Sequence, residues 1–164
     1  MNGMHQDEVR RLHEEVKDPF PTGKLRVRFV ALCNGDAQTV LDRCKQVLNV
    51  VLQANIEDWP STDAWRSRLP EWFVEQSAEE ISQAEAERRL QLSMKERMSL
   101  SQRWSVSAFV HWFQPVERYW YWWDAEVKDA NIIQVEVIAE DEPFPWGSLD
   151  WLLRAAGALS VEEL

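Results

Sequence analysis

The sequence is poor in the residues from which many catalytic and metal sites are built. Its 164 residues include two cysteines, three histidines and five glycines. Cys33 and Cys44 lack the paired spacing of zinc or redox motifs, and we interpret both as small buried apolar residues. The glycines do not cluster into a phosphate-binding loop, and the sequence has no HExxH or calcium-loop pattern. These absences favour a protein that uses no metal ion and no cofactor.

Long apolar stretches are scarce as well. The run from Val47 to Leu52 contains Asn49 and is far shorter than the roughly 20 apolar residues that span a bilayer. The beginning of the chain mixes acidic and basic side chains, unlike a secretory signal peptide. We therefore expect a cytoplasmic protein that does not bind membranes.

Basic residues are outnumbered by acidic ones, 18 to 28, and the formal net charge is -10. Such a charge disfavours double-stranded nucleic acid as a partner and favours a basic protein. Between Glu136 and Asp150 the chain has several acidic residues and neither lysine nor arginine. This segment is either a solvated loop or a contact surface. Its candidate contact residues are Glu140, Asp141 and Glu142.

A strand followed by a helix is the clearest local pattern in the first half of the chain. From Leu25 to Cys33 apolar side chains occupy every second position, which is typical of a strand. Asp36 is then placed to act as the N-cap of a helix. That helix has an apolar stripe at spacings of three and four, made of Val40, Leu41, Cys44, Val47, Leu48, Val51 and Leu52. A short helix is also expected between Gln6 and Val16.

Residues 59–103 are expected to form a helical insertion. The spacing of Ser77 and Glu80 indicates a capping box, from which a long charged helix can continue to about Met98. The apolar side of this helix is thin, so we expect an exposed helix or an arm.

Alternation of apolar side chains predicts two further strands, residues 104–113 and 118–127, joined by a hairpin loop. A third strand follows, with Ile133, Val135 and Val137 on one face. The register predicts that Trp112 and Trp123 face the main core.

A last helix is expected to start with Ser148 as its N-cap and to end before Gly157. Together these elements predict one α+β domain over residues 1–164. Its antiparallel sheet of about four strands consists of the first strand and a C-terminal three-stranded meander, packed with helices.

The second face of the predicted sheet is rich in aromatic residues. The residues of this aromatic face are Phe109, His111, Arg118, Trp120, Trp122 and Asp124. Such a face is either covered by helices as a second core or left open for binding, because an exposed apolar area of this size is unusual in a monomer.

Three functions are compatible with these patterns. The leading hypothesis is a noncatalytic protein-binding module, such as an inhibitor or immunity-type protein for a basic partner, and the chain is more readily interpreted as a non-enzyme. The second is a small-molecule or nucleotide-binding protein that uses the aromatic face. The third is a small hydrolase-type enzyme in which His111 acts with Asp124 or a nearby glutamate. A homodimer formed through the aromatic face is a further expectation.

Overall fold

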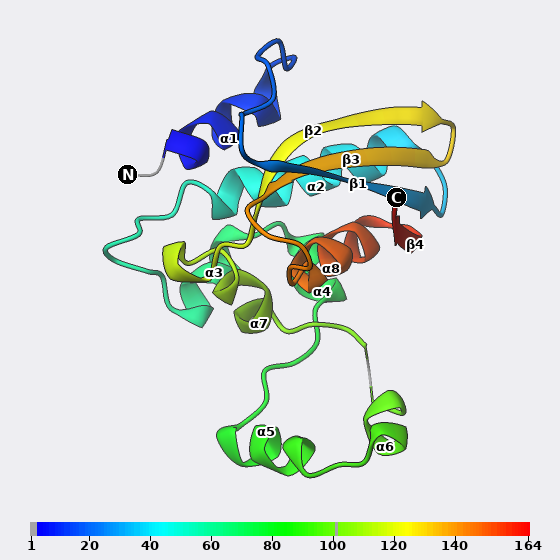
Figure 1. Ribbon diagram of the computed structural model, residues 1–164. Coiled ribbons are helices and arrows are strands. Elements are labelled where there is room, and N and C mark those ends of the chain that lie inside the picture. The colour runs from blue at the N-terminus through cyan, green and yellow to red at the C-terminus, as the bar shows by residue number, and fades with distance from the viewer. Residues whose placement is uncertain (1–2, 101) are drawn as a thin grey trace.

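The computed structural model describes residues 3–100 and 102–164 and contains one antiparallel sheet (Figure 1). Its strands are β1 (Leu25–Cys33), β2 (Trp120–Asp129), β3 (Ile132–Ala139) and β4 (Ala158–Glu163). They lie in the order β2-β3-β1-β4, and each neighbouring pair is antiparallel. The predicted α+β class with four antiparallel strands is confirmed.

Helices surround this sheet. They are α1 (Gly3–His13), α2 (Ala37–Val51), α3 (Thr62–Arg68), α4 (Glu71–Gln76), α5 (Gln83–Leu90), α6 (Met94–Met98), α7 (Val106–His111) and α8 (Gly147–Ala156), with a 3-10 turn, η1, at Pro115–Glu117. Within the described residues, each helix is too short or too polar to cross a membrane.

The predicted strand and helix of the first half are confirmed as β1 and α2. The Asp36 carboxylate accepts a hydrogen bond from the Thr39 backbone N–H at 3.0 Å, as an N-cap should. Every residue of the predicted apolar stripe is buried, from Val40 to Leu52. Helices α2 and α8 pack together, and their apolar faces form the main core with one side of the sheet.

The predicted strand at residues 104–113 is wrong, because this segment contains helix α7. Ser105 caps the helix by accepting a hydrogen bond from the Ala108 N–H at 3.2 Å. The buried side chains are those of Val106, Phe109, Val110 and Phe113. The last three of these residues are three, four and seven positions after Val106, which is the spacing of one helix face. Apolar residues of this segment also alternate as in a strand, and packing against α3 favours the helix.

Strand β2 contains a bulge that reverses the predicted facing of its tryptophans. Its register with β3 shifts between Trp122 and Asp124, so Trp123 is the extra residue. Trp122 therefore lies in the main core, whereas Trp123 packs on the opposite face in a smaller cluster with Tyr121 and Ile138. The prediction that Trp123 belongs to the main core is wrong for this reason. Trp112, at the end of α7, is only partly buried.

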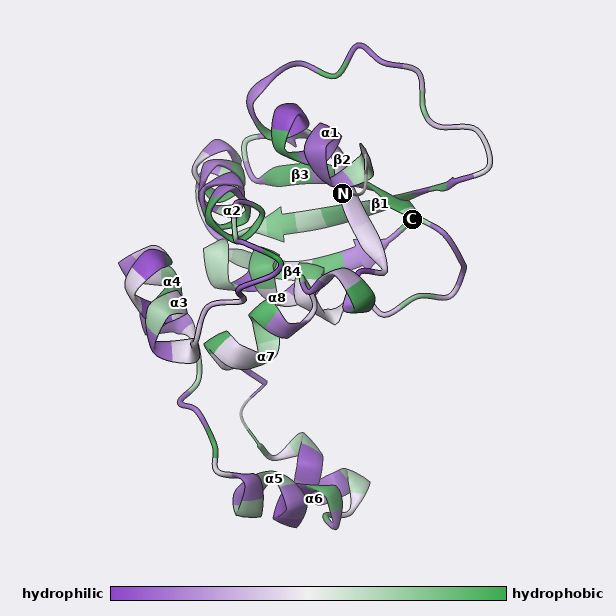
Figure 2. Ribbon diagram, turned by 90° about the vertical axis from the view of Figure 1, so that its left-hand side faces the viewer, coloured by the Kyte–Doolittle hydropathy of each residue, from purple (hydrophilic) through white to green (hydrophobic). Residues whose placement is uncertain are grey.

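The insertion contains four helices, α3 to α6, but not the predicted long one. Ser77 ends α4 instead of starting a helix, since its hydroxyl donates to the Phe73 carbonyl at 2.8 Å. The Glu80 carboxylate accepts from the Ser107 backbone N–H at 3.0 Å. Short helices α5 and α6 begin after Ser82 and Ser93, and both lie away from the sheet (Figures 1 and 2).

The C-terminal strand β4 was not predicted. Helix α8 ends at Gly157, whose φ of 131° lets the chain turn directly into β4, beside β1. The prediction that Ser148 caps α8 is also wrong, because Trp146 occupies the N-cap position. The Ser148 hydroxyl instead accepts a hydrogen bond from the Trp120 indole N–H at 3.0 Å in the core.

Candidate functional site

The predicted aromatic face is not an open surface. Phe109, Trp120 and Trp122 are buried in the main core, with Phe113 packed between the first two. They come together because α7 and the bulged part of β2 both face α8, so a stacking platform on these rings is not formed. Arg118 and His111 lie outside that core and have different surroundings.

His111 and Asp124 do not form the expected catalytic pair. The His111 side chain is half exposed on α7, with its Nε2 atom 3.8 Å from the Glu117 carboxylate. The exposed Asp124 carboxylate accepts a hydrogen bond from the backbone N–H of its neighbour, Ala125, at 2.8 Å. The carboxylate beside His111 is therefore that of Glu117 and not that of Asp124.

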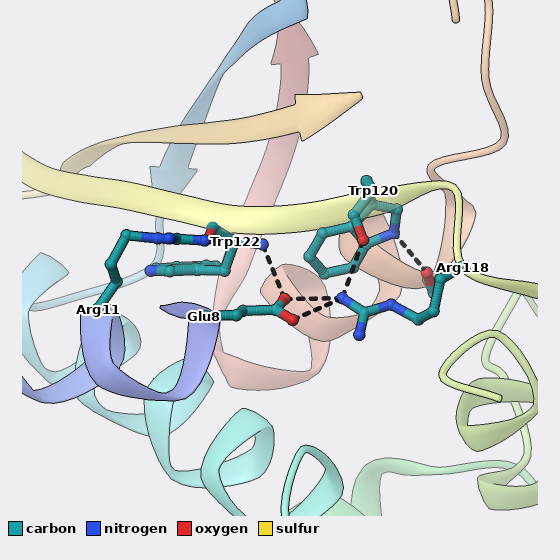
Figure 3. A network of polar contacts seen from close by, with 6 residues as sticks. Glu8, Arg11, Arg118, Trp120 and Trp122 are labelled. Atoms are coloured by element: carbon teal, nitrogen blue, oxygen red, sulfur yellow. Dashed lines mark hydrogen bonds and ion pairs between the residues drawn. The ribbon is translucent and has the colours of Figure 1, made fainter. Parts of the chain in front are cut away.

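Helix α1 covers the outer edge of β2 with two charged side chains (Figure 3). The Glu8 carboxylate accepts a hydrogen bond from the Trp122 backbone N–H at 2.8 Å, and Arg11 donates to the Trp122 carbonyl at 2.9 Å. The backbone N–H and carbonyl of Trp122, at this outer edge of the sheet, are thus both hydrogen-bonded. The sequence signal, an Arg three residues after a Glu within an amphipathic helix, does not reveal this role.

Arg118 neutralises Glu8 within the protein. The Arg118 side chain is only 5% exposed and that of Glu8 is fully buried, and their closest N–O distance is 2.7 Å. The Arg118 Nη2 atom also donates to the Trp120 carbonyl at 2.9 Å (Figure 3). Arg118 was predicted as a binding residue, but its carboxylate partner was not predicted because it is 110 positions away.

A cavity of about 630 Å³ lies beside this ion pair. Its walls include the C-terminal end of α2 with the residues that follow it, and also Trp59, Phe113, Arg118 and Tyr121. Arg118 therefore has Glu8 on one side and the cavity on the other. The cavity was not predicted from sequence because its walls come from distant segments.

The predicted acidic residues Glu140, Asp141 and Glu142 are exposed after β3. Glu140 forms an ion pair with Lys24 at 2.7 Å. Glu142 is hydrogen-bonded to the Glu163 carboxyl at the end of β4, and this contact raises the pKa of Glu163 above its ordinary value. We call these four acidic residues, Glu140, Asp141, Glu142 and Glu163, the acidic edge.

Strand β4, which carries Glu163, is at the opposite edge of the sheet from β2 and α1, and the other residues of the acidic edge follow β3. Strand β4 is an outer strand, and Leu159 and Leu164 at its two ends are largely exposed. By contrast, Glu136 of the neighbouring β3 is neutralised by Arg26 and Arg28, each at 3.3 Å. Glu142 and Glu163, whose carboxyl groups contact each other, therefore concentrate negative charge at the C-terminal end of β4.

The cysteines provide no obvious reactive group. Cys33 and Cys44 are buried free thiols, and burial raises the pKa of each. Within residues 3–100 and 102–164, no three His, Cys, Asp or Glu side chains are grouped so that they could hold a metal ion.

Among the described residues, the acidic edge and the cavity are thus two surfaces with features suited to binding. Comparison with known proteins adds no precedent for either of them. No family model, no curated protein and no solved structure matches this chain, so its function has to be argued from its own geometry.

Proposed function

We propose that this protein is a noncatalytic protein-binding module whose acidic edge recognises a basic partner. The observation that carries the proposal is the contact between the Glu142 and Glu163 carboxyl groups on the exposed end of β4. Two carboxylates held this close repel one another when both are ionised, and a lysine or arginine from a partner relieves that repulsion.

The shape of this region supports a protein partner. Strand β4 is an outer strand, and a segment of another protein can pair with such an edge through main-chain hydrogen bonds. Leu164, which follows Glu163, supplies exposed apolar surface next to the carboxylates. The net charge of -10 favours fast association with a basic partner at low ionic strength.

The other functions have less support from the geometry. The aromatic rings expected to bind a small molecule are in the main core, and His111 Nε2 is 3.8 Å from the Glu117 carboxylate, which is too long for a hydrogen bond. A binding role for the acidic edge requires neither.

A charge-reversal experiment tests the proposal. Partners are captured by chemical cross-linking in cells of the source organism, identified by mass spectrometry, purified and titrated by calorimetry at low and high salt. The triple variant E140K/D141K/E142K should lose salt-sensitive binding. Its matched control, D58K/E75K/E79K, makes the same change of net charge at exposed positions elsewhere and should retain most of the affinity.

Two results would overturn the proposal. One is a partner that binds both triple variants equally weakly, which would show a response to net charge alone. The other is a partner whose affinity is unchanged by reversal at the acidic edge. Circular dichroism spectra of both variants verify that the fold is retained.

A further inference from the structure

The cavity beside Arg118 is separate from the acidic edge and does not depend on the proposed function. It lies next to α1 and the C-terminal end of α2, whereas the acidic edge lies after β3 and at the end of β4. Its volume of about 630 Å³ falls in the range of small-molecule sites in proteins, which is roughly 300–1,000 Å³.

The walls of this cavity combine apolar surface with one buried cation. Trp59, Phe113 and Tyr121 supply aromatic rings, and Leu52 and Ala54 supply aliphatic groups. Arg118 supplies a guanidinium on a side chain that is almost completely buried. An apolar pocket with one fixed charged group is typical of sites that bind a small molecule in a defined orientation.

Arg118 is held rigidly and has donor capacity beyond its contact with Glu8. The hydrogen bonds recorded between Arg118 and other described residues all leave from Nη2. The guanidinium carbon lies 4.3 Å from the centre of the Tyr121 ring and 5.3 Å from that of Phe113. Figure 3 shows a second guanidinium nitrogen directed away from Glu8. A guanidinium has five N–H donors, so two carboxylates can share it.

We propose that this cavity binds a small aromatic carboxylate, whose ring packs against the aromatic walls and whose carboxylate accepts hydrogen bonds from Arg118. Glu8 already balances the charge of Arg118, so the ligand gains affinity from directed hydrogen bonds and not from net attraction. The exposed Glu57 on the cavity wall weakens the binding of anions only slightly, because water screens its charge. A cationic ligand group has no acceptor for these N–H donors, so it would bind more weakly.

Three probes with one ring system test the ligand class. Indole-3-acetate, its neutral amide and tryptamine are each titrated into the ¹⁵N-labelled protein and followed by NMR. Indole-3-acetate should shift the signals of residues 51–59 and 113–121 in a saturable way. The amide should bind about tenfold more weakly, since it loses charge-assisted hydrogen bonds, and tryptamine more weakly still.

Two variants locate the site. Arg118→Lys keeps a cation beside Glu8 but loses the planar set of donors, so the preference for the acetate over the amide should fall about tenfold. Ala54→Leu leaves Arg118 intact but fills part of the cavity, so it should weaken the acetate and the amide alike. Melting curves check that both variants are folded.

Several outcomes would overturn the inference. They are failure of indole-3-acetate to saturate at millimolar concentration, equal affinity for the acetate and the amide, stronger binding of tryptamine, and shifts that map outside the cavity. If Arg118→Lys does not fold, the comparison of probes on the natural chain and on Ala54→Leu still decides the question.

Discussion

Trp122 and Trp123 are neighbours in β2, but they stabilise different clusters. Trp122 lies in the main core, whereas Trp123 packs against the Phe20 ring, with centroids 5.1 Å apart, and under the Arg11 guanidinium. We expect Trp122→Ala to cost about 3–5 kcal/mol of unfolding free energy and Trp123→Ala about 2 kcal/mol, because the second cluster is small and partly exposed. Urea denaturation measures both. Equal losses of unfolding free energy would contradict the placement of Trp122 and Trp123 on opposite faces of the sheet.

Glu8 is the residue on which the covered edge of the sheet depends most. Glu8→Ala leaves the buried Arg118 without its carboxylate and the Trp122 backbone N–H without an acceptor. Loss of one partner from a buried ion pair typically costs about 3–5 kcal/mol, and we expect a loss of that size. Asp7→Ala is the control, because Asp7 is an exposed acidic neighbour and should contribute less than about 0.5 kcal/mol. Similar denaturation midpoints for the two variants would show that the ion pair is unimportant.

Among the elements, those with one unambiguous pattern were predictable from sequence. In β1 and α2 the apolar spacing fits a single period, and Asp36 marks the helix start. The apolar residues of the α7 segment fit a strand pattern and also a helix pattern, so the local sequence could not decide between the two. The bulge at Trp123 places the β2 side chains before it on the opposite sheet face from the predicted one, because a shift of a single residue exchanges the two faces.

Of the two candidate binding surfaces, only the acidic edge could be predicted in part from the sequence. Glu140, Asp141 and Glu142 are adjacent in the chain and were predicted as exposed contact residues. Their association with Glu163 required β4, a short strand whose alternation is weak. The cavity required Arg118 and the end of α2 to meet through tertiary contacts, for which no local pattern exists.

We expect the rest of the fold to be stable without helices α5 and α6. None of their residues is buried, and the chain enters and leaves this arm where the Ala78 N–H donates to the Trp104 carbonyl at 2.8 Å. Replacing residues 82–102 by a short Gly/Ser linker keeps that contact and the cap from Glu80. We therefore expect a change of less than about 1 kcal/mol in unfolding free energy, measured in urea. A larger loss would show that the arm packs on the body.

For the whole molecule, the excess of acid makes stability depend on pH, and Glu163 contributes to this. Its pKa is raised in the folded protein by the hydrogen bond to Glu142. Its contribution is therefore favourable below the ordinary Glu pKa of about 4.3 and is lost as pH rises through the raised value. Glu163→Gln should be slightly more stable than the natural chain at pH 7, by no more than a few tenths of a kcal/mol, and should lose this advantage near pH 4. Thermal melts across this pH range measure the difference, and a constant difference would contradict the contact.

The two outer edges of the sheet differ, and the difference affects how many copies of the chain can join by strand addition. On β2, α1 occupies the backbone groups of Trp122, and two bulges interrupt the edge, whereas on β4 the Arg154 guanidinium occupies the Leu159 carbonyl near the start of the strand. A second copy that adds its own β4 to the rest of this edge places its β2, with α1, at the far side of the joined sheet. Two copies that met through β4 would form a closed pair with α1 at both far ends, not a growing filament. By occupying part of the β2 edge, helix α1 thus favours a closed pair over continued strand addition.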